Sequence, residues 1–167
     1  MSSSAGKLRC EIDVAGFQLV VIADASRVLR SVIRPSPEEN RTLESCPQGL
    51  NAPLEAAVQF IDNYSRGLDA PVPPLDLSAC SEAERNVYLA CMRIPFGSTM
   101  SYGELALSAG YPRAARFAGS CMRKNRFMLF VPCHRVVPAS GGVGLYSGGE
   151  DVKAALLAFE RAAGSSN

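Results

Sequence analysis

The 167-residue chain lacks several features, and each absence excludes a class of protein. No apolar run approaches the roughly 18–20 residues needed to span a bilayer, so we expect no membrane association. The N-terminal residues lack the apolar segment of a secretory signal, so we expect a protein that is not secreted and keeps its thiols reduced. The six cysteines form no C-x-x-C pair and there is one histidine, so we expect no metal and no other cofactor.

The composition is that of a folded protein with an uneven charge distribution. Apolar residues make up 47% and charged residues 20%, which is enough for a core in one domain or two small ones. The net charge of +1 conceals a segment with eight basic residues and one acidic residue, Glu104, while the remainder of the chain carries −6. Such a segment favours a face that binds a polyanion, with a solvated basic surface as the alternative. The basic residues are Arg85, Arg93, Arg113, Arg116, Arg123, Lys124, Arg126 and Arg135.

The first half of the chain predicts a small α+β domain. Apolar residues recur at helical spacing and predict a helix over residues 53–65: they are Leu54, Ala57, Val58 and Ile61. Prolines mark residues 67–79 as a linker, and we place the domain boundary after residue 75. Three strands, the first two joined by a tight turn at Ala15-Gly16, predict a short and mainly antiparallel sheet over residues 8–14, 17–23 and 28–33.

The second half predicts a mainly helical domain over residues 76–167. Ser81 and Ser101 each stand three residues before a glutamate, the pattern of a capping box at a helix start. The helix after Ser101 ends at Gly110, and a helix over 112–123 follows, which together predict a helix-turn-helix. The fold class is therefore α/β with two small domains. The remaining elements are a strand at 128–131, a Gly-rich loop at 140–149 and a helix over 150–162 with Val152, Ala155, Leu156 and Phe159 on one face.

Two groups of residues in this half are candidates for chemistry. Cys133 stands beside His134 and Arg135; cations favour the reactive thiolate, although most isolated cysteines are inert core residues. Neighbours on an extended chain point to opposite sides, so His134 would take the Cys133 proton through a water, with Glu160 as a candidate to orient the imidazole. Apart from Arg113, Arg116 and Phe117, the next predicted helix has small side chains. Such a helix can approach a duplex closely or pack tightly on a neighbouring helix.

Pro132-Cys133-His134-Arg135-Val136 resembles the active-site signature of the O6-alkylguanine-DNA alkyltransferases, also called methylated-DNA–protein-cysteine methyltransferases. Further motifs follow the family's order and spacing, so the resemblance covers about residues 81–161. The first 75 residues match only in their general layout and lack the family's usual Ser-Pro-Leu-Gly turn. The further motifs are Ser101-Tyr-Gly-Glu-Leu-Ala, Ala114-Ala-Arg116, Asn125, Gly144-Leu-Tyr-Ser-Gly-Gly and Leu156-Leu-Ala-Phe-Glu160.

The resemblance implies a role for each matching residue. Cys133 is the expected alkyl acceptor, His134 its base through a water and Glu160 the carboxylate that orients His134. Arg116 is the expected finger that fills the stack after the base flips out. Tyr102 is expected to rotate the nucleotide and to protonate the departing guanine. Asn125 is expected to brace the active-site turns; Ala115, Arg113, Arg123 and Ser101 to contact DNA; and Met122, Val136, Val143, Gly144, Tyr146 and Ser147 to form the substrate pocket.

The implied function is direct-reversal repair of O6-alkylguanine, with O4-alkylthymine as a second substrate. The alkyl group passes irreversibly to Cys133 after base flipping, once per molecule, and needs no cofactor. The expected partner is double-stranded DNA, bound through its minor groove by a monomer in the nucleus of a eukaryote or the cytoplasm of a prokaryote. Three alternatives stay open: a lesion sensor that does not react, a thiol hydrolase that uses Cys133 and His134, and a helix-turn-helix regulator.

Overall fold

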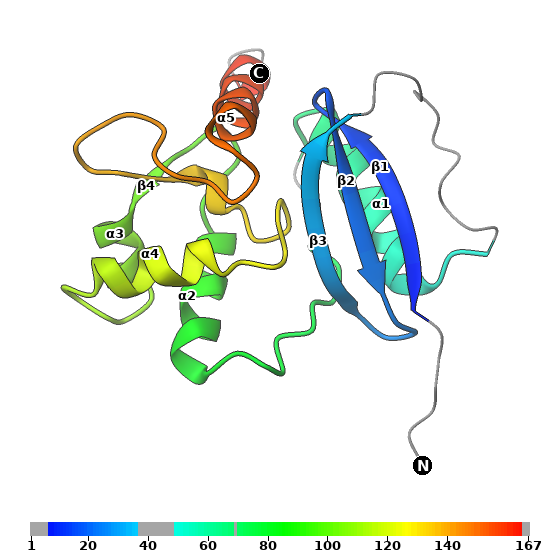
Figure 1. Cartoon of the computed structure of the whole chain (residues 1–167), viewed down its shortest axis with the longest axis horizontal. Helices are drawn as coiled ribbons and strands as arrows, with labels where there is room; N and C mark the ends of the chain where they lie inside the picture. The colour runs from blue at the N-terminus through cyan, green and yellow to red at the C-terminus, as the bar shows by residue number, and fades with distance from the viewer. Residues whose placement is uncertain (1–6, 37–48, 69, 165–167) are drawn as a thin grey trace. The chain divides into compact units, whose positions relative to one another are not determined.

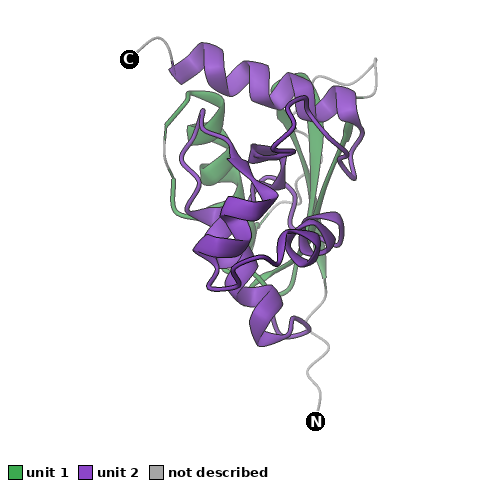
Figure 2. Ribbon diagram, turned by 90° about the vertical axis from the view of Figure 1, so that its left-hand side faces the viewer, with its two compact units in different colours: residues 1–76 green, residues 77–167 purple. Residues whose placement is uncertain are grey.

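The computed structural model describes residues 7–36, 49–68 and 70–164 and divides the chain into two compact units. Unit 1 comprises residues 1–76 and unit 2 comprises residues 77–167, so the division falls one residue beyond the expected boundary (Figure 2). The predicted fold class is confirmed: unit 1 contains a small antiparallel sheet with a helix, and unit 2 is mainly helical.

Unit 1 is a three-stranded antiparallel sheet in the order β1-β2-β3, packed against one helix, α1 (Figure 1). Ala15 and Gly16 both have positive φ, at 49° and 82°, as a two-residue turn that matches the strand twist requires. Asn51 caps α1 by accepting a hydrogen bond from Leu54 N at 3.2 Å. The elements are β1 Leu8–Val14, β2 Phe17–Ala23, β3 Val28–Pro35 and α1 Ala52–Ser65.

Two expectations for unit 1 need correction. The segment predicted as a linker is partly bound to the sheet, because Val28 N donates to Pro74 O at 2.7 Å and Asp76 N donates to Val28 O at 2.8 Å. Cys10 on β1 is disulfide-bonded, so the expectation of reduced thiols is wrong at this position. The cysteines of unit 2 are not disulfide-bonded: Cys80, Cys91, Cys121 and Cys133.

Unit 2 contains four helices and a short parallel pair of strands among its described residues. Both predicted capping boxes are confirmed. The hydroxyls of Ser81 and Ser101 each accept a hydrogen bond from the backbone N–H of the glutamate three residues later, and the carboxylate of that glutamate accepts one from the backbone N–H of the serine. No helix in the described part of the chain is long and apolar enough to cross a membrane. The elements are α2 Glu82–Met92, β4 Met100–Ser101, α3 Tyr102–Ser108, α4 Ala115–Arg123, the 3₁₀ turn η1 Cys133–Arg135, β5 Val136–Val137 and α5 Glu150–Gly164.

Helices α3 and α4 pack against each other and form the predicted helix-turn-helix (Figure 1). Gly110 follows α3 with φ 89°, and Tyr111 N donates to Ala106 O at 2.8 Å, which closes the helix with a Schellman motif. Helix α4 begins at Ala115, later than predicted, because Arg113 has a φ of 67° and cannot continue a right-handed helix. The two arginines therefore differ: Arg113 lies in the turn and Arg116 in the first turn of α4.

Residues 128–131 do not form the predicted strand. Leu129 has a φ of 74°, and Val131 N donates back to Phe127 O at 2.8 Å, so the chain turns. Phe127 and Leu129 are fully buried, so the apolar run that suggested a strand belongs to a buried turn instead. The turn leads directly into η1, and Cys133–Arg135 is a helical turn rather than the extended segment that we expected.

The buried face of α5 is also rotated from the predicted one. Val152 and Leu156 are buried as expected, whereas Ala155 and Phe159 are only partly buried. Lys153 and Glu160 are fully buried on that face. A pattern based on hydrophobicity assigns charged residues to the surface, which is why it misplaces this face.

Candidate active site

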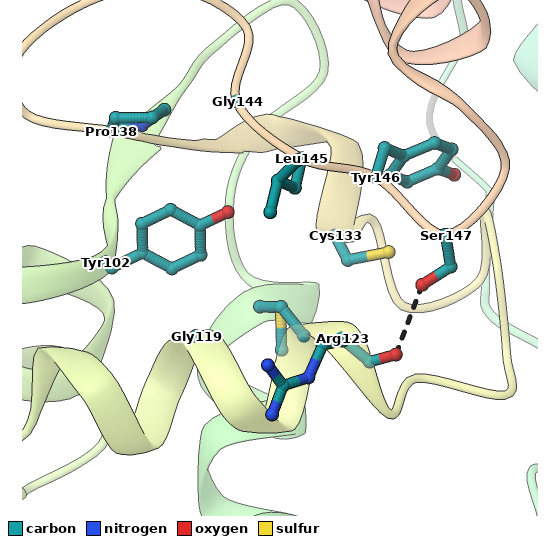
Figure 3. Close-up of a pocket in the computed structure, with 10 residues that line it drawn as sticks. Tyr102, Gly119, Arg123, Cys133, Pro138, Gly144, Leu145, Tyr146 and Ser147 are labelled. Atoms are coloured by element: carbon teal, nitrogen blue, oxygen red, sulfur yellow. Dashed lines mark hydrogen bonds between the residues drawn. The ribbon is translucent and has the colours of Figure 1, made fainter.

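Cys133 lies in a cavity of about 590 Å³ in unit 2 (Figure 3). Its side chain is almost fully buried at the start of η1. The pairing of β4 with β5 brings Tyr102 and Cys133 to one cavity. Strand β4 leads into α3, which begins with Tyr102, and β5 follows η1, which begins with Cys133. The lining residues are Tyr102, Gly119, Met122, Arg123, Cys133, Pro138, Gly144, Leu145, Tyr146 and Ser147.

Asn125 connects the Cys133 sulfur to the turn before it. Its Nδ2 donates to Cys133 Sγ at 3.0 Å and to Val131 O at 2.9 Å, while its Oδ1 accepts from Phe127 N at 2.9 Å. All three hydrogen bonds are buried, so the amide fixes both the turn and the sulfur. This is the bracing role that the resemblance implies for Asn125.

The Cys133 thiol is protonated in the resting site. Burial raises its pKa, and the hydrogen bond from Asn125 and the charge of Lys153 oppose that shift without cancelling it. A thiolate is the nucleophilic form of cysteine, so a base is needed. The nearest candidate along the chain is His134.

His134 and Glu160 form a fully buried hydrogen bond of 2.7 Å between Nε2 and Oε1. Burial by itself raises the pKa of the Glu160 carboxyl. Hydrogen bonds and charges from His134 and Arg135 outweigh burial and lower this pKa to about 2. A carboxylate can only accept, so Nε2 carries the proton and Nδ1 has the lone pair. Burial also lowers the pKa of His134, and Nδ1 has no hydrogen-bond partner among the described residues, so the imidazole is a neutral base with a free acceptor.

Arg135 binds Glu160 rather than acting on Cys133. Its Nε and Nη2 reach the carboxylate at 3.0 Å, and its Nη1 donates to Ile94 O at 2.7 Å. Gly97 N adds a further hydrogen bond to Glu160 Oε2 at 2.9 Å. The expectation that Arg135 favours the Cys133 thiolate is therefore corrected: its charge holds the carboxylate that orients His134.

The cation that acts on Cys133 is Lys153, which sequence analysis missed. Its Nζ is buried and donates to Val136 O at 2.7 Å and to Leu145 O at 3.4 Å. Its charge lowers the pKa of Cys133, while burial lowers its own pKa. One signal was available: Lys153 precedes Glu160 by seven residues, so two residues of one helix face reach the same site.

A basic surface surrounds α4. Arg113, Arg116, Arg123 and Arg126 are exposed, and no ion pair involves them within the described ranges. Arg135 is removed from this surface by its buried pair with Glu160, and Lys124 lies 3.8 Å from Glu84. The basic surface is therefore smaller than the charge of the segment suggested, and it is concentrated on the helix-turn-helix.

The structure brings most of the predicted pocket residues together, but not all. Met122, Gly144, Tyr146 and Ser147 line the cavity, whereas Val136 and Val143 do not. Val136 is fully buried, and its carbonyl accepts from Lys153. Ser101 caps α3 through its hydroxyl, and Arg123, predicted to contact DNA, also lines the cavity. No group of three His, Cys, Asp or Glu residues that could hold a metal occurs in the described part of the chain.

The fold and the site together define a class of protein: a helix-turn-helix domain with a buried Cys–His–Glu array under a cavity beside its second helix. A family model described as 6-O-methylguanine DNA methyltransferase, DNA binding domain, matches residues 82–162. A methylated-DNA–protein-cysteine methyltransferase of Mycolicibacterium paratuberculosis is 49% identical over 87 residues, 52% of either chain. That of Mycobacterium leprae is 38% identical over 112 residues, 66% of this chain and 67% of the relative.

Solved structures extend the likeness to both units. The crystal structure of Mycobacterium tuberculosis OGT in complex with DNA is 32% identical, covers 92% of each chain and has a TM-score of 0.71. The chain belongs to the methylated-DNA–protein-cysteine methyltransferase family. Its matches span between about half and two thirds of the length of the first curated relatives.

Proposed function

We propose that this protein repairs DNA by moving an alkyl group from O6 of guanine to Sγ of its own Cys133. The observation that carries the proposal is the buried Glu160–His134 hydrogen bond directly beside Cys133, which lines a cavity next to α4. A thiol with a positioned base is suited to attack a carbon electrophile. The solved structure of a relative in complex with DNA supports DNA as the partner. In this proposal the DNA is a duplex, and α4 contacts its minor groove.

The reaction balances without a cofactor. His134 Nδ1 takes the Cys133 proton through one water, and Glu160 stabilises the resulting imidazolium. The sulfur lone pair forms a bond to the alkyl carbon while the carbon–O6 bond breaks and its electrons go to guanine. The Tyr102 hydroxyl supplies the proton that guanine needs; burial raises its pKa, so the hydroxyl is protonated at neutral pH. The proton held by His134 then returns through solvent to the Tyr102 phenolate, so no net proton is gained or lost.

The substrate base must leave the duplex to reach the buried sulfur. Extruding a base costs a few kcal/mol, and less for a poorly paired damaged base. Arg116 is exposed in the first turn of α4, where it can fill the vacated position in the stack. The other exposed arginines around α4 bind phosphates, which makes binding strongly dependent on salt.

The thioether product has no leaving group that a simple hydrolysis would release, so each molecule reacts once. A cavity of about 590 Å³ has room for an alkylated pyrimidine as well, so O4-alkylthymine belongs to the proposed substrates. We further propose that the protein acts as a monomer, in the nucleus of a eukaryote or the cytoplasm of a prokaryote, where its substrate DNA lies.

Mass spectrometry of the intact protein tests this function. After mixing with a duplex that contains one O6-methylguanine, we expect each chain to gain one methyl group in place of a hydrogen, mapped to the Cys133 peptide. Selective binding to the lesion without a mass gain would replace the proposal with a sensor. No gain and no preference for the lesion would favour a thiol hydrolase.

Two variants control the assignment. Cys133→Ala removes the acceptor and should abolish the mass gain while DNA binding persists. Cys80→Ala removes a partly exposed thiol outside the cavity and should leave the transfer unchanged. Methylation of the Cys133→Ala protein at another cysteine would move the acceptor and overturn the mechanism.

A further inference from the structure

The turn between α2 and β4, residues 95–98, contacts the buried array of His134, Arg135 and Glu160 from outside the cavity. Ser98 N donates to Pro95 O at 3.1 Å, and Gly97 has a φ of 75° at the third position, which is the geometry of a type II turn. These four residues belong to the described part of the chain, and none of them lines the cavity. An effect of the turn on the reaction must therefore pass through the array.

The backbone of the turn reaches Glu160. Gly97 N donates to Glu160 Oε2 at 2.9 Å, and a Cβ on Gly97 would lie 3.4 Å from the main-chain oxygen of Glu160, so the turn lies directly against α5. Gly97 N and Arg135 Nε bind Oε2, while His134 Nε2 donates to Oε1. The turn thus holds the carboxylate oxygen opposite the one that receives the imidazole.

The same turn covers Arg135 with an aromatic ring. Arg135 Cζ lies over the ring of Phe96 at 5.7 Å from its centroid, which is a cation–π contact. Phe159 of α5 meets the Phe96 ring edge-on, with the two centroids 6.2 Å apart and an interplanar angle of 82°. The two rings are partly exposed whereas the Arg135 side chain is buried, so the rings stand between the array and solvent.

Hydrogen bonds and the ring restrain Arg135 in different directions. The donors of a guanidinium lie in its plane, so its hydrogen bonds fix it within that plane and leave its faces uncovered. Nη1 binds Ile94 O at 2.7 Å, and Nε and Nη2 bind Glu160, so the plane is held at both ends. The Phe96 ring lies over a face of the same group, where it excludes water and opposes movement out of the plane.

We infer that Phe96 is a positioning residue for the alkyl transfer and acts through Arg135 and Glu160. The ring keeps the guanidinium on the carboxylate, and the carboxylate keeps His134 in the tautomer that accepts the Cys133 proton. The inference rests on the alkyl transfer proposed above and adds a residue that lies outside the cavity. An aliphatic side chain at this position would fill space but would not attract the guanidinium.

Single-turnover kinetics over a range of pH test the inference. The substrate is a duplex with one O6-methylguanine, and the measured quantity is the rate constant of transfer to Cys133 between pH 5 and pH 9. Phe96→Leu removes the ring and should slow transfer at pH 7 roughly fivefold. Phe96→Tyr keeps the ring and should stay within about twofold of the wild-type rate. Phe96→Met is a second variant without a ring, should behave as Phe96→Leu does and replaces it if the leucine variant does not fold.

The acidic limb of the pH profile separates positioning from packing. Transfer slows as the pH falls through the pKa of His134, because the protonated imidazole is no longer a base. Burial lowers this pKa, Glu160 raises it, and the charges of Arg135 and Lys153 lower it. In Phe96→Leu, water reaches the array and Arg135 is held less closely, so both lowering influences weaken and the limb should move to higher pH by about half a unit. A loss of packing alone slows transfer without moving the limb.

Removal of a ring from unit 1 is the matched control. Phe60 of α1 stacks on Tyr64 with centroids 6.3 Å apart, and Phe60→Leu should lower stability without changing the rate or the acidic limb. Equal slowing by Phe96→Leu and Phe96→Tyr with an unmoved limb, or no slowing by either, would leave Phe96 with a packing role alone. Both results overturn the inference while the repair function stands. A wild-type protein that transfers no methyl group overturns the proposed function itself.

Discussion

The two units of this protein treat charge in opposite ways. In unit 1 the described ion pairs are solvent-exposed, such as Arg34 with Glu11 at 3.1 Å, and the buried polar residues are the neutral Gln18 and Ser31. Unit 2 buries His134 and three charged side chains: Arg135, Lys153 and Glu160. Buried charge contributes little net stability, because desolvation offsets most of the attraction. The difference therefore indicates that unit 2 keeps its buried charges for chemistry rather than for stability.

The largest expected effect comes from breaking one ion pair in each unit. Arg135→Met leaves Glu160 buried without its guanidinium partner, and we expect a loss of about 3–5 kcal/mol in the free energy of unfolding. Arg34→Met breaks an exposed pair and should lose no more than about 1 kcal/mol. Urea denaturation of both variants measures the difference. Equal losses would show that the two ion pairs contribute alike and would remove the contrast between the units.

Acid should weaken unit 2 through Glu160. The pKa of this carboxyl falls from an ordinary value of 4.5 to about 2 in the folded protein, so the unfolded chain binds more protons between these values. The stabilisation is present above pH 5 and is lost as the pH falls toward 2, by roughly 3 kcal/mol at most. Amide hydrogen exchange between pH 5 and 3 should show protection falling more steeply in α5 than in β2. Parallel loss in both elements would argue against a special contribution of Glu160.

Arg116→Ala tests the basic surface without touching the buried array. If Arg116 replaces the extruded base, the variant should repair duplex DNA about 10- to 100-fold more slowly, which corresponds to part of the few kcal/mol of extrusion. Its reaction with free O6-benzylguanine, which needs no extrusion, should be nearly unchanged. Equal slowing with the duplex and the free base would remove the finger role.

The smallest expected effect compares two matched helix caps. Ser81→Ala and Ser101→Ala each remove one capping box, so each should lower the free energy of unfolding by about 1 kcal/mol. Only Ser101 stands at the start of the helix-turn-helix, so only its variant should weaken DNA binding in a titration at fixed salt. Unaltered DNA affinity of Ser101→Ala would leave Ser101 with its capping role alone.

Local sequence patterns were sufficient for most secondary structure. Short apolar segments and the tight turn at Ala15-Gly16 predicted the three strands of unit 1, and the glutamates three residues after Ser81 and Ser101 predicted two helix starts. These features depend on neighbours within a few residues, so they can be found in one sequence. The prediction was wrong at residues 128–131, where an apolar run fits both a strand and a buried turn and Leu129 adopts a positive φ.

The sequence by itself determined the candidate nucleophile, its histidine neighbour and the basic helix, because motif, charge and spacing are local properties. Only the tertiary structure decided that Arg135 binds Glu160, that Lys153 is the cation acting on Cys133 and that Leu145 points into the cavity. Each of these depends on α5 or the loop before it packing against η1 and β5. Burial and charge pairing are set by such long-range contacts, and the energy of a charged side chain depends on what surrounds it rather than on its sequence neighbours.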